Sequence, residues 1–238
     1  DSSRLQNCFD VVKKFAAKTT ASNIVVTYVP HNTDVSISGE YFVIKGRDML
    51  RTKCFGRDFE FSVQGFFQNN SEMADEMHAY VHGVLKHQVS LSSANKYAML
   101  LDLYGGVGTF GINNAGLFKK VITVESVAPC IDAAKNNIAI NSLKNIEAVL
   151  MDAEALNRLP VSKPLFVVTD PPRSGMTPKT IERLKKMDPD LIIYISCNIE
   201  QLKKDIPKFR EYKILDAAVF DFFPQTNHME SVVVLIRA

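Results

Sequence analysis

The sequence has no tryptophan, only four cysteines among 238 residues, and no apolar run near the ~20 residues that a membrane-spanning helix needs. We therefore expect no membrane segment. The four cysteines form no C-x-x-C pair and have no histidine at the spacing of a metal ligand, so we expect no metal site. Unpaired cysteines favour a reducing compartment, which predicts a cytoplasmic or other intracellular protein.

The chain also lacks an initial Met and a signal-peptide pattern, because it begins Asp1-Ser2-Ser3-Arg4. Such a start is typical of an excised fragment. Hydrophobic residues make up 46% and charged residues 23% of the chain, which excludes disorder, collagen-like repeats and disulfide miniproteins. The length suits one large domain with or without a small appendage, and we expect a monomer. A net charge of +2 argues neither for nor against nucleic acid.

Residues 1–62 are expected to form a small α+β region, which could be the remainder of a larger domain. Apolar residues at helical spacing predict a helix over residues 4–18. Short β-rich segments follow, and the predicted strands are Ile24–Val29, Val35–Ser38, Tyr41–Lys45 and two runs on either side of Gly56-Arg57. These elements indicate no chemistry by themselves.

Residues 63–238 change to apolar strands that alternate with longer helices, which is typical of a doubly wound, mostly parallel α/β sheet. The predicted strands are Ala98–Leu103, Lys120–Glu125, Ile146–Met151, Leu165–Asp170, Leu191–Ser196, Ile214–Phe220 and Ser231–Ile236. Helices are predicted over Gly105–Leu117 and Val127–Asn141. A further helix, with Ser71 as its cap, carries the apolar stripe Met73, Met77, Val81 and Val84.

A glycine-rich turn follows the first of these seven strands. Gly105, Gly106 and Gly108 let the backbone approach a ligand, and the next helix offers unpaired amides. Glu125 ends the following strand, where a carboxylate can accept both hydroxyls of a ribose, as in dinucleotide and S-adenosylmethionine (SAM) sites. NAD stays open at this point, although the glycine spacing is not G-x-G-x-x-G.

Three further segments carry reactive side chains at strand ends. Asp170 precedes two prolines, which hold its carboxylate rigidly at the carboxyl edge of the sheet. Cys197 lies one step beyond a buried strand and at the start of a helix, where a thiolate is stabilised, so it is the candidate nucleophile among the cysteines. His228 and Glu230 are two candidate general bases just before the last strand.

Five motifs occur in a characteristic order over about residues 60–238. They are Phe66-Phe67-Gln68-Asn69-Asn70, Asp102-Leu103-Tyr104-Gly105-Gly106-Val107-Gly108-Thr109-Phe110, Asp170-Pro171-Pro172-Arg173-Ser174-Gly175, Ser196-Cys197-Asn198 and Phe223-Pro224-Gln225-Thr226-Asn227-His228-Met229-Glu230. In this combination the chain resembles the RNA 5-methyluridine methyltransferases, SAM-dependent enzymes that act on tRNA or rRNA. The resemblance implies a Rossmann-like methyltransferase whose last strand is antiparallel.

The same resemblance implies roles for single residues and a partner. The SAM site would be lined by Gln68, Tyr104, Thr109, Glu125 and Asp170, with Asp152 near the adenine. Cys197 would be the nucleophile and Glu230 the base. RNA would be the substrate, presented as an unstacked uridine, for which Phe67 and Phe222 are possible stacking partners if they are not core residues.

The chain departs from the family in three respects. It shows neither the usual N-terminal OB-like domain nor the cysteine cluster of some members, and Gly105 stands where many members have Cys, a change that a turn tolerates.

Two other functions stay open. One is a SAM-dependent methyltransferase acting on an exocyclic amine held by Asp170-Pro171-Pro172, which would have no use for the thiolate of Cys197. The other is a non-catalytic RNA-binding fragment. The sequence does not distinguish tRNA from rRNA.

Overall fold

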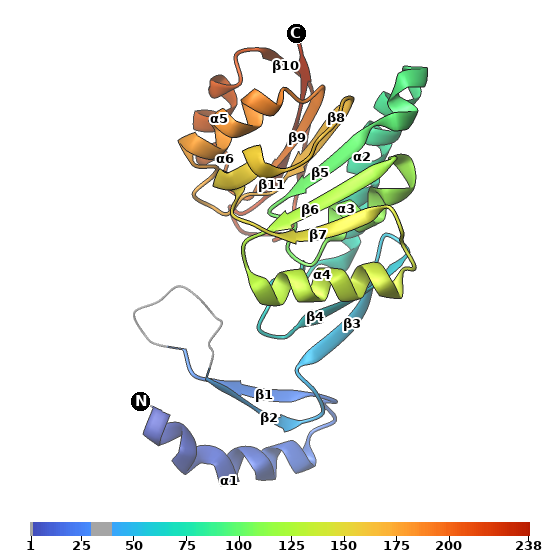
Figure 1. Ribbon diagram of the computed structural model, residues 1–238. Helices are drawn as coiled ribbons and strands as arrows, with labels where there is room; N and C mark the ends of the chain where they lie inside the picture. The colour runs from blue at the N-terminus through green and yellow to red at the C-terminus, as the bar shows by residue number, and fades with distance from the viewer. Residues whose placement is uncertain (1, 30–39) are drawn as a thin grey trace. The chain divides into compact units, whose positions relative to one another are not determined.

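The structure, a computed structural model, describes residues 2–29 and 40–238 (Figure 1). The chain forms two compact units. The smaller comprises residues 1–52 and 60–67, and the larger comprises residues 53–59 and 68–238.

The smaller unit combines one helix with a two-stranded antiparallel sheet. Helix α1 (Ser2–Lys18) confirms the predicted helix, and strand β1 (Ile24–Thr27) pairs with β2 (Tyr41–Lys45). The rings of Phe9 on α1 and Phe42 on β2 meet edge to face at 5.1 Å between centroids. Strand β1 ends two residues earlier than predicted. The predicted strand Val35–Ser38 lies outside the described residues.

A hairpin of β3 (Met49–Cys54) and β4 (Arg57–Ser62) follows. The two residues between the strands, Phe55 and Gly56, have φ values of 50° and 78°. Positive φ at both central positions is the backbone of the tight turns that match the twist of paired strands. Glycine supplies this conformation at low cost at the second position. The two strands predicted around Gly56-Arg57 are therefore confirmed.

The larger unit is built on a seven-stranded sheet with the strand order β10-β11-β9-β8-β5-β6-β7 (Figure 1). Its strands are β5 (Met99–Leu103), β6 (Lys120–Glu125), β7 (Ile146–Leu150), β8 (Leu165–Thr169), β9 (Leu191–Ser196), β10 (Tyr212–Phe220) and β11 (Glu230–Arg237). Strands β5 to β9 pair in parallel, and β11 runs antiparallel between β9 and β10. The predicted Rossmann-like sheet with an antiparallel last strand is confirmed.

Helices cover both faces of this sheet. They are α2 (Ser71–Ser90), α3 (Thr109–Asn114), α4 (Ala128–Ile140), α5 (Pro178–Met187) and α6 (Ile199–Asp205), with short 3-10 turns η1 (Ser93–Tyr97), η2 (Ala115–Leu117), η3 (Ala153–Arg158) and η4 (Ile206–Lys208). Leu100 of β5 packs in one core cluster with Val81 of α2. The neighbouring Leu101 packs in a second cluster with Leu184 of α5 and Leu202 of α6. Burial on both faces explains why these strands are continuously apolar rather than alternating.

The starts of α2 and α3 differ from the sequence prediction. The cap of α2 is Asn70 rather than Ser71, because the Asn70 side chain accepts a hydrogen bond from the Met73 N–H at 3.2 Å. Either residue type can cap a helix, so the sequence did not separate them. Helix α3 begins at Thr109 instead of Gly105, because Gly106 and Gly108 have positive φ and form a turn.

Candidate functional site

Polar side chains from several strands meet at one edge of the seven-stranded sheet. Tyr104 follows β5, Glu125 ends β6, Asp170 follows β8 and Cys197 follows β9. Parallel strands end at the same edge, which is where open α/β folds bind ligands. Strand β11 runs the other way and begins at this edge with Glu230. The topology thus gathers residues that are far apart in the sequence.

The glycine-rich turn encloses a buried carboxyl group. Asp102 of β5 is buried, and its Oδ2 accepts hydrogen bonds from the Gly111 N–H at 2.9 Å and the Thr123 hydroxyl at 3.2 Å. Burial raises the pKa of Asp102 to about 7 against the effect of these donors, with smaller contributions from the charges of Asp170 and Glu125.

Glu125 is held in place by the backbone around it. Its Oε1 accepts hydrogen bonds from the backbone N–H groups of Ser126 and Val127 at 2.7 and 2.9 Å. Its Oε2 accepts one from the Gly106 N–H at 3.2 Å, which ties the carboxylate to the glycine-rich turn. A Cβ built on Gly106 would meet no atom within 4 Å, so this side of the turn faces open space beside Glu125.

The other residues expected around SAM lie on or near this edge or in the loop before α2. Asp152 caps η3, just after β7, and accepts a hydrogen bond from the Glu154 N–H at 2.7 Å. Tyr104 is half-buried, and burial, with the charge of Asp152 among the lesser causes, raises its pKa. Thr109 is the first residue of α3, and Gln68 lies half-buried in the loop before α2.

Glu230 and Cys197 lie next to each other at the ends of the adjacent strands β11 and β9. Ser231 of β11 pairs with Ser196 of β9, so the antiparallel ladder continued by one residue places Glu230 opposite Cys197. The Glu230 side chain is buried, with 6% of the residue exposed, and its Oε2 has no hydrogen-bond partner among the described residues. Burial, followed by the charge of Asp170, raises the pKa of Glu230 to about 7, against the opposing charge of Arg173.

The environment of Cys197 corrects one sequence expectation. Burial raises the pKa of the thiol, and the negative charges of Glu230 and Asp170 raise it further. Arg173 opposes both effects through its charge and a hydrogen bond to the sulfur. The pKa of Cys197 is therefore raised in the free protein, opposite to the effect expected from the following helix, because burial is the largest effect and the carboxylates of Glu230 and Asp170 add to it.

The other three cysteines lie in different surroundings. Cys8 is exposed on α1. Cys130 is half-buried in α4, and burial is the first cause of its raised pKa. Cys54 is fully buried, 3.9 Å from the Nδ2 of Asn113, and burial raises its pKa to about 12.

A family model described as tRNA (Uracil-5-)-methyltransferase matches residues 31–238. The chain belongs to this family. The motif resemblance in the sequence is thereby confirmed.

Two curated relatives of this chain are called RNA methyltransferases. The protein of Nanoarchaeum equitans is 37% identical over 86% of this chain and 43% of its own length. The protein of Caldanaerobacter subterraneus is 34% identical over 96% of this chain and 50% of its own length. The chain thus spans about half the length of the relatives that it matches.

A solved structure resembles most of this chain. It is the crystal structure of Pyrococcus abyssi tRNA (uracil-54, C5)-methyltransferase in complex with S-adenosyl-L-homocysteine, with a TM-score of 0.75 and 27% identity. The match covers 93% of this chain and 52% of that one.

Three residues of the site were not singled out in the sequence. Asp102, Arg173 and Asn198 each lie inside a family motif, which was the only signal available. Asn198 caps α6 by accepting from the Glu200 N–H at 3.1 Å, and its Nδ2 donates to the Arg173 carbonyl at 3.0 Å. It therefore ties the Cys197 turn to the loop after Asp170.

The structure corrects the expectation for stacking aromatics. Phe222 is a core residue with 3% of its surface exposed, so it is not available to a base. Phe67 is half-buried and stacks on Phe61 at 4.3 Å between ring centroids. The exposed rings of these motifs are instead Phe66, 74% exposed, and Phe223. His228 is exposed and approaches the Phe223 ring edge to face at 6.5 Å.

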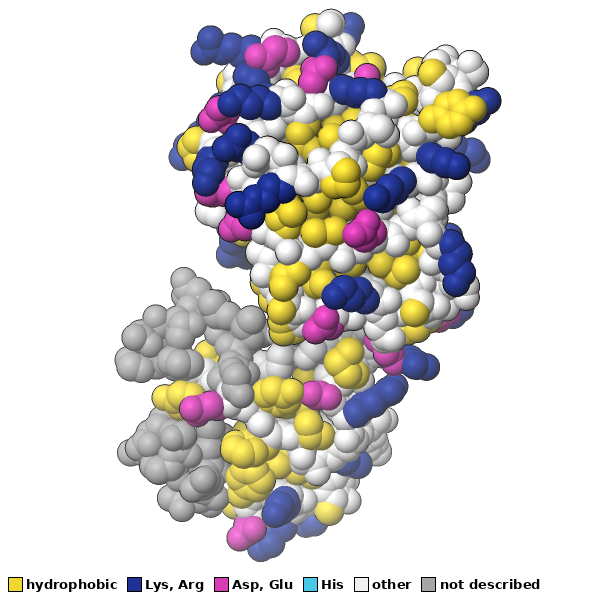
Figure 2. Space-filling model, in the orientation of Figure 1, with side chains coloured by type: hydrophobic (Ala, Val, Ile, Leu, Met, Phe, Trp, Pro, Cys, Tyr) yellow, Lys and Arg dark blue, Asp and Glu magenta, His cyan; other side chains and the backbone are white. Residues whose placement is uncertain are grey.

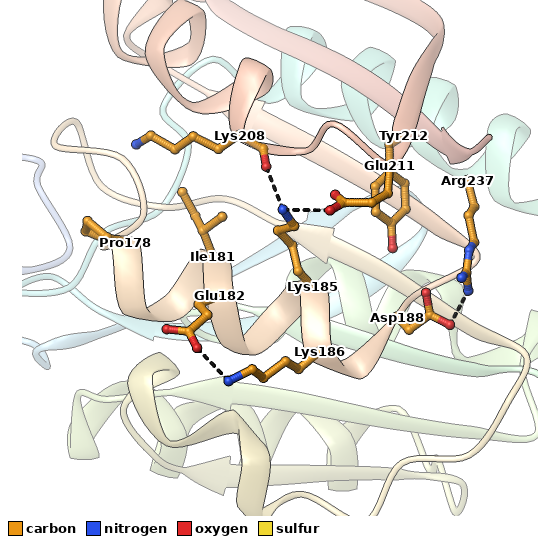
Figure 3. Close-up of a pocket in the computed structure, with 10 residues that line it drawn as sticks. All are labelled: Pro178, Ile181, Glu182, Lys185, Lys186, Asp188, Lys208, Glu211, Tyr212 and Arg237. Atoms are coloured by element: carbon orange, nitrogen blue, oxygen red, sulfur yellow. Dashed lines mark hydrogen bonds and ion pairs between the residues drawn. The ribbon is translucent and has the colours of Figure 1, made fainter.

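A cavity of about 500 Å³ lies elsewhere on the larger unit (Figure 3). It is lined by α5, by the start of β10 and by Arg237 at the end of β11, and none of the predicted site residues lines it. Most of its charged side chains form ion pairs within the cavity: Lys185 pairs with Glu211 at 3.0 Å, and Arg237 pairs with Asp188. The surface of the larger unit seen in Figure 2 likewise mixes basic, acidic and apolar side chains.

Neither a metal-binding cluster nor a membrane-spanning helix is found in residues 2–29 and 40–238. Within these ranges no group of three or more His, Cys, Asp or Glu side chains is placed to hold a metal ion. Within the same ranges no helix is long and apolar enough to span a membrane.

Proposed function

We propose that the chain is the catalytic part of a SAM-dependent RNA methyltransferase that forms 5-methyluridine in tRNA or rRNA. The observation that carries this proposal is the register of β9 and β11, which sets Glu230 opposite Cys197 beside Asp170 and Arg173. Family membership and a structural neighbour named as a tRNA (uracil-54, C5)-methyltransferase support the same reaction.

The proposed SAM site consists of Gln68, Tyr104, Thr109, Glu125, Asp152 and Asp170. The fixed carboxylate of Glu125 suits the two ribose hydroxyls, and the open space above Gly106 lets a ligand approach the turn. Asp170 supplies a further carboxyl at the same edge. The sulfonium group of SAM supplies the methyl group when it is bound. The chain's own residues hold this cofactor and act on the uracil.

Carbon 5 of uracil is by itself too weak a nucleophile to take the methyl group. Cys197 is the proposed nucleophile that activates the ring by attacking carbon 6. The sulfur of Cys197 forms a bond to carbon 6, and the electron pair of the 5,6 double bond moves into an enolate. Carbon 5 of the enolate then takes the methyl group. Arg173 favours the thiolate form of Cys197, while the carboxylates of Glu230 and Asp170 oppose it.

Glu230 is the proposed base for the last step. After methyl transfer, carbon 5 still carries its hydrogen. When Glu230 takes that proton, the electron pair of the C–H bond re-forms the double bond and the carbon–sulfur bond breaks. A pKa near 7 allows the carboxylate to accept a proton at neutral pH, and the Oε2 of Glu230 has no partner among the described residues that competes for it.

The experiment combines the full-length protein, SAM and RNA that carries 5-fluorouridine. Fluorine at carbon 5 does not leave as a proton, so a covalent complex on Cys197 should accumulate and be mapped by mass spectrometry. Cys197→Ala should abolish it, and Cys130→Ala, at the other half-buried cysteine, should not. Mapping of the RNA to another cysteine contradicts the proposal. Methylation of an amine without an adduct would favour the exocyclic-amine reaction, and absence of SAM binding would favour an RNA-binding fragment.

With ordinary uridine RNA, Glu230→Gln separates the base from the nucleophile. The variant should attack and methylate but release product at least ~100-fold more slowly, so a methylated protein–RNA complex should survive a denaturing gel. His228→Ala is the matched control, because the exposed His228 is the other base candidate. Release by Glu230→Gln at the parent rate, or trapping by His228→Ala, would show that the base is wrongly assigned.

A further inference from the structure

We infer that Asp205 is a positioning residue that fixes the loop carrying Arg173 against the strand and helix that hold Cys197. The inference rests on the proposed function, since it assigns Asp205 a role toward the proposed nucleophile. Asp205 is the last residue of α6 and lies outside every family motif recognised in the sequence.

Asp205 is completely buried and receives four hydrogen bonds. Its Oδ2 accepts from the Tyr194 hydroxyl at 2.7 Å and from the Met176 N–H at 3.3 Å. Its Oδ1 accepts from the Lys208 Nζ at 2.7 Å and from the Gln201 Nε2 at 3.2 Å. A carboxylate with no exposure needs such a set of donors, because an unpaired buried charge would be strongly destabilising.

The donors belong to the segments that form the reactive part of the site. Met176 directly follows the loop from Asp170 to Gly175. Tyr194 lies on β9, the strand that leads to Cys197. Gln201 lies on α6, the helix that follows Cys197. One carboxylate therefore joins the loop after β8 to the strand and helix on either side of the nucleophile.

The loop passes unusually close to this carboxylate. Gly175 has a φ of 73°, and a Cβ built there would lie 2.4 Å from the Oδ2 of Asp205 and 2.6 Å from the Cγ of Gln201. Only glycine combines this backbone conformation with this approach. The contact lets the Met176 N–H reach Asp205, so the glycine of the Asp170–Gly175 motif is explained by a residue outside the motif.

Lys208, three residues after Asp205, donates one of these four hydrogen bonds. In Figure 3 its ammonium group points away from the labelled Lys185, and it pairs with Asp205 instead of a charge in the cavity. At the beginning of the loop, the Asp170 N–H donates to the Leu103 carbonyl at 3.3 Å. The loop is thus attached at both ends, and the segment between them carries Arg173, whose positive charge lowers the pKa of Cys197.

Asp205→Asn tests this role in the full-length protein. The amide keeps the size of the carboxylate, but its NH₂ group faces two hydrogen-bond donors. The Met176 end of the loop should therefore shift, while Asp170 at the other end stays attached. A displacement of about 1 Å in a reacting group can lower a rate about 100-fold. We expect kcat for methyl transfer to fall about 10- to 100-fold, with the KM for SAM changed less than about threefold. Tyr194→Phe, which removes one donor, should lower kcat less.

The control is Asp190→Asn. Asp190 also accepts a backbone N–H, that of Leu165 at 2.8 Å, and pairs with a lysine, Lys163, but it lies at the opposite edge of the sheet. Its variant should keep the parent kcat. Equal losses of kcat in the Asp205 and Asp190 variants, or a higher KM for SAM at unchanged kcat, would overturn the inference. Should Asp205→Asn fail to fold, Tyr194→Phe decides, and an unchanged kcat in that variant overturns the inference as well.

Alkylation of Cys197 by iodoacetamide across pH gives a readout that does not depend on methyl transfer. Displacement of Arg173 removes the group that favours the thiolate, while Glu230 and Asp170 stay on the sheet, so the apparent pKa of alkylation should rise in Asp205→Asn. An unchanged profile would contradict the positioning role. If the parent protein forms no adduct with 5-fluorouridine RNA, the proposed function fails, and the alkylation profile still tests Asp205 separately.

Discussion

The turn after β5 is closely packed around Gly105. A Cβ built on it would lie 2.4 Å from the Cγ2 of Thr123 and 2.9 Å from the Oδ2 of Asp102. Thr123 is completely buried, so its methyl group has no free direction to move. Glycine at this position therefore leaves room for the buried carboxyl group under the turn, and a cysteine here would need different neighbours.

We predict that Gly105→Ala lowers the free energy of unfolding by about 1–3 kcal/mol, because the added methyl group overpacks the site. Gly116→Ala is the matched control, since a Cβ there would meet no atom within 4 Å and its φ is not in the left-handed region. Urea unfolding monitored by circular dichroism measures both. A midpoint for Gly105→Ala equal to that of the parent would show that the turn accommodates the methyl group.

The hairpin of β3 and β4 shows how an element is held by side chains that bond to its backbone. Within the larger unit, the Phe55 N–H donates to the Oδ1 of Asp75 on α2 at 2.7 Å. Asn141, the C-cap of α4, donates from its Nδ2 to the Asp58 carbonyl at 2.7 Å and accepts from the Asp58 N–H at 3.3 Å. These bonds attach residues 53–59 to two helices.

Asn141→Ala should loosen this attachment. It removes both hydrogen bonds to the backbone of the exposed Asp58, and each lost bond should cost about 0.5–1.5 kcal/mol. Hydrogen exchange of the Asp58 amide should accelerate, while amides of the central strands β5 and β8 keep their protection. Asn157→Ala, at an exposed position on η3, is the control and should leave the exchange of Asp58 unchanged.

Over the whole molecule, buried titratable groups act in opposite directions on stability. The pKa values of Asp102, Asp170 and Glu230 are raised to about 7, mainly by burial. The folded protein holds these protons more tightly than the unfolded chain, so their contribution is fully present below about pH 4 and is lost as the pH rises to 7. Burial lowers the pKa of His78 to about 4, so its contribution is lost as the pH falls from about 6.5 to 4.

Asp102→Asn tests this balance at one group, because asparagine resembles the protonated acid at every pH. A change from the ordinary value of 3.8 to about 7 corresponds to roughly 4 kcal/mol. The variant should therefore be more stable than the parent at pH 8, by up to about 4 kcal/mol, and should approach the parent at pH 4. Urea unfolding at both pH values measures the difference. A difference that does not change with pH would contradict the raised pKa.

The strands of the seven-stranded sheet and their order along the chain could be predicted from the sequence, because their signals are local. Strand β9 matches its predicted bounds, Leu191–Ser196, since a short run of apolar, β-branched residues between polar ones has few other interpretations. The motifs also determined the family. The sequence could not predict boundaries that depend on a single hydrogen bond, such as the cap at Asn70.

The environment of the site depends on tertiary contacts that the sequence pattern did not predict. The neighbour of Cys197 across the sheet is Glu230, which comes from the reversed strand β11, and the direction of the Cys197 pKa follows from its burial and from charges on β8 and β11. The burial of Phe222 and the hydrogen bonds that Asp205 accepts from Met176 and Tyr194 likewise arise from other segments of the chain. Burial and electrostatic interactions depend on distance in space, and a local sequence pattern carries no information about which distant residues will supply them.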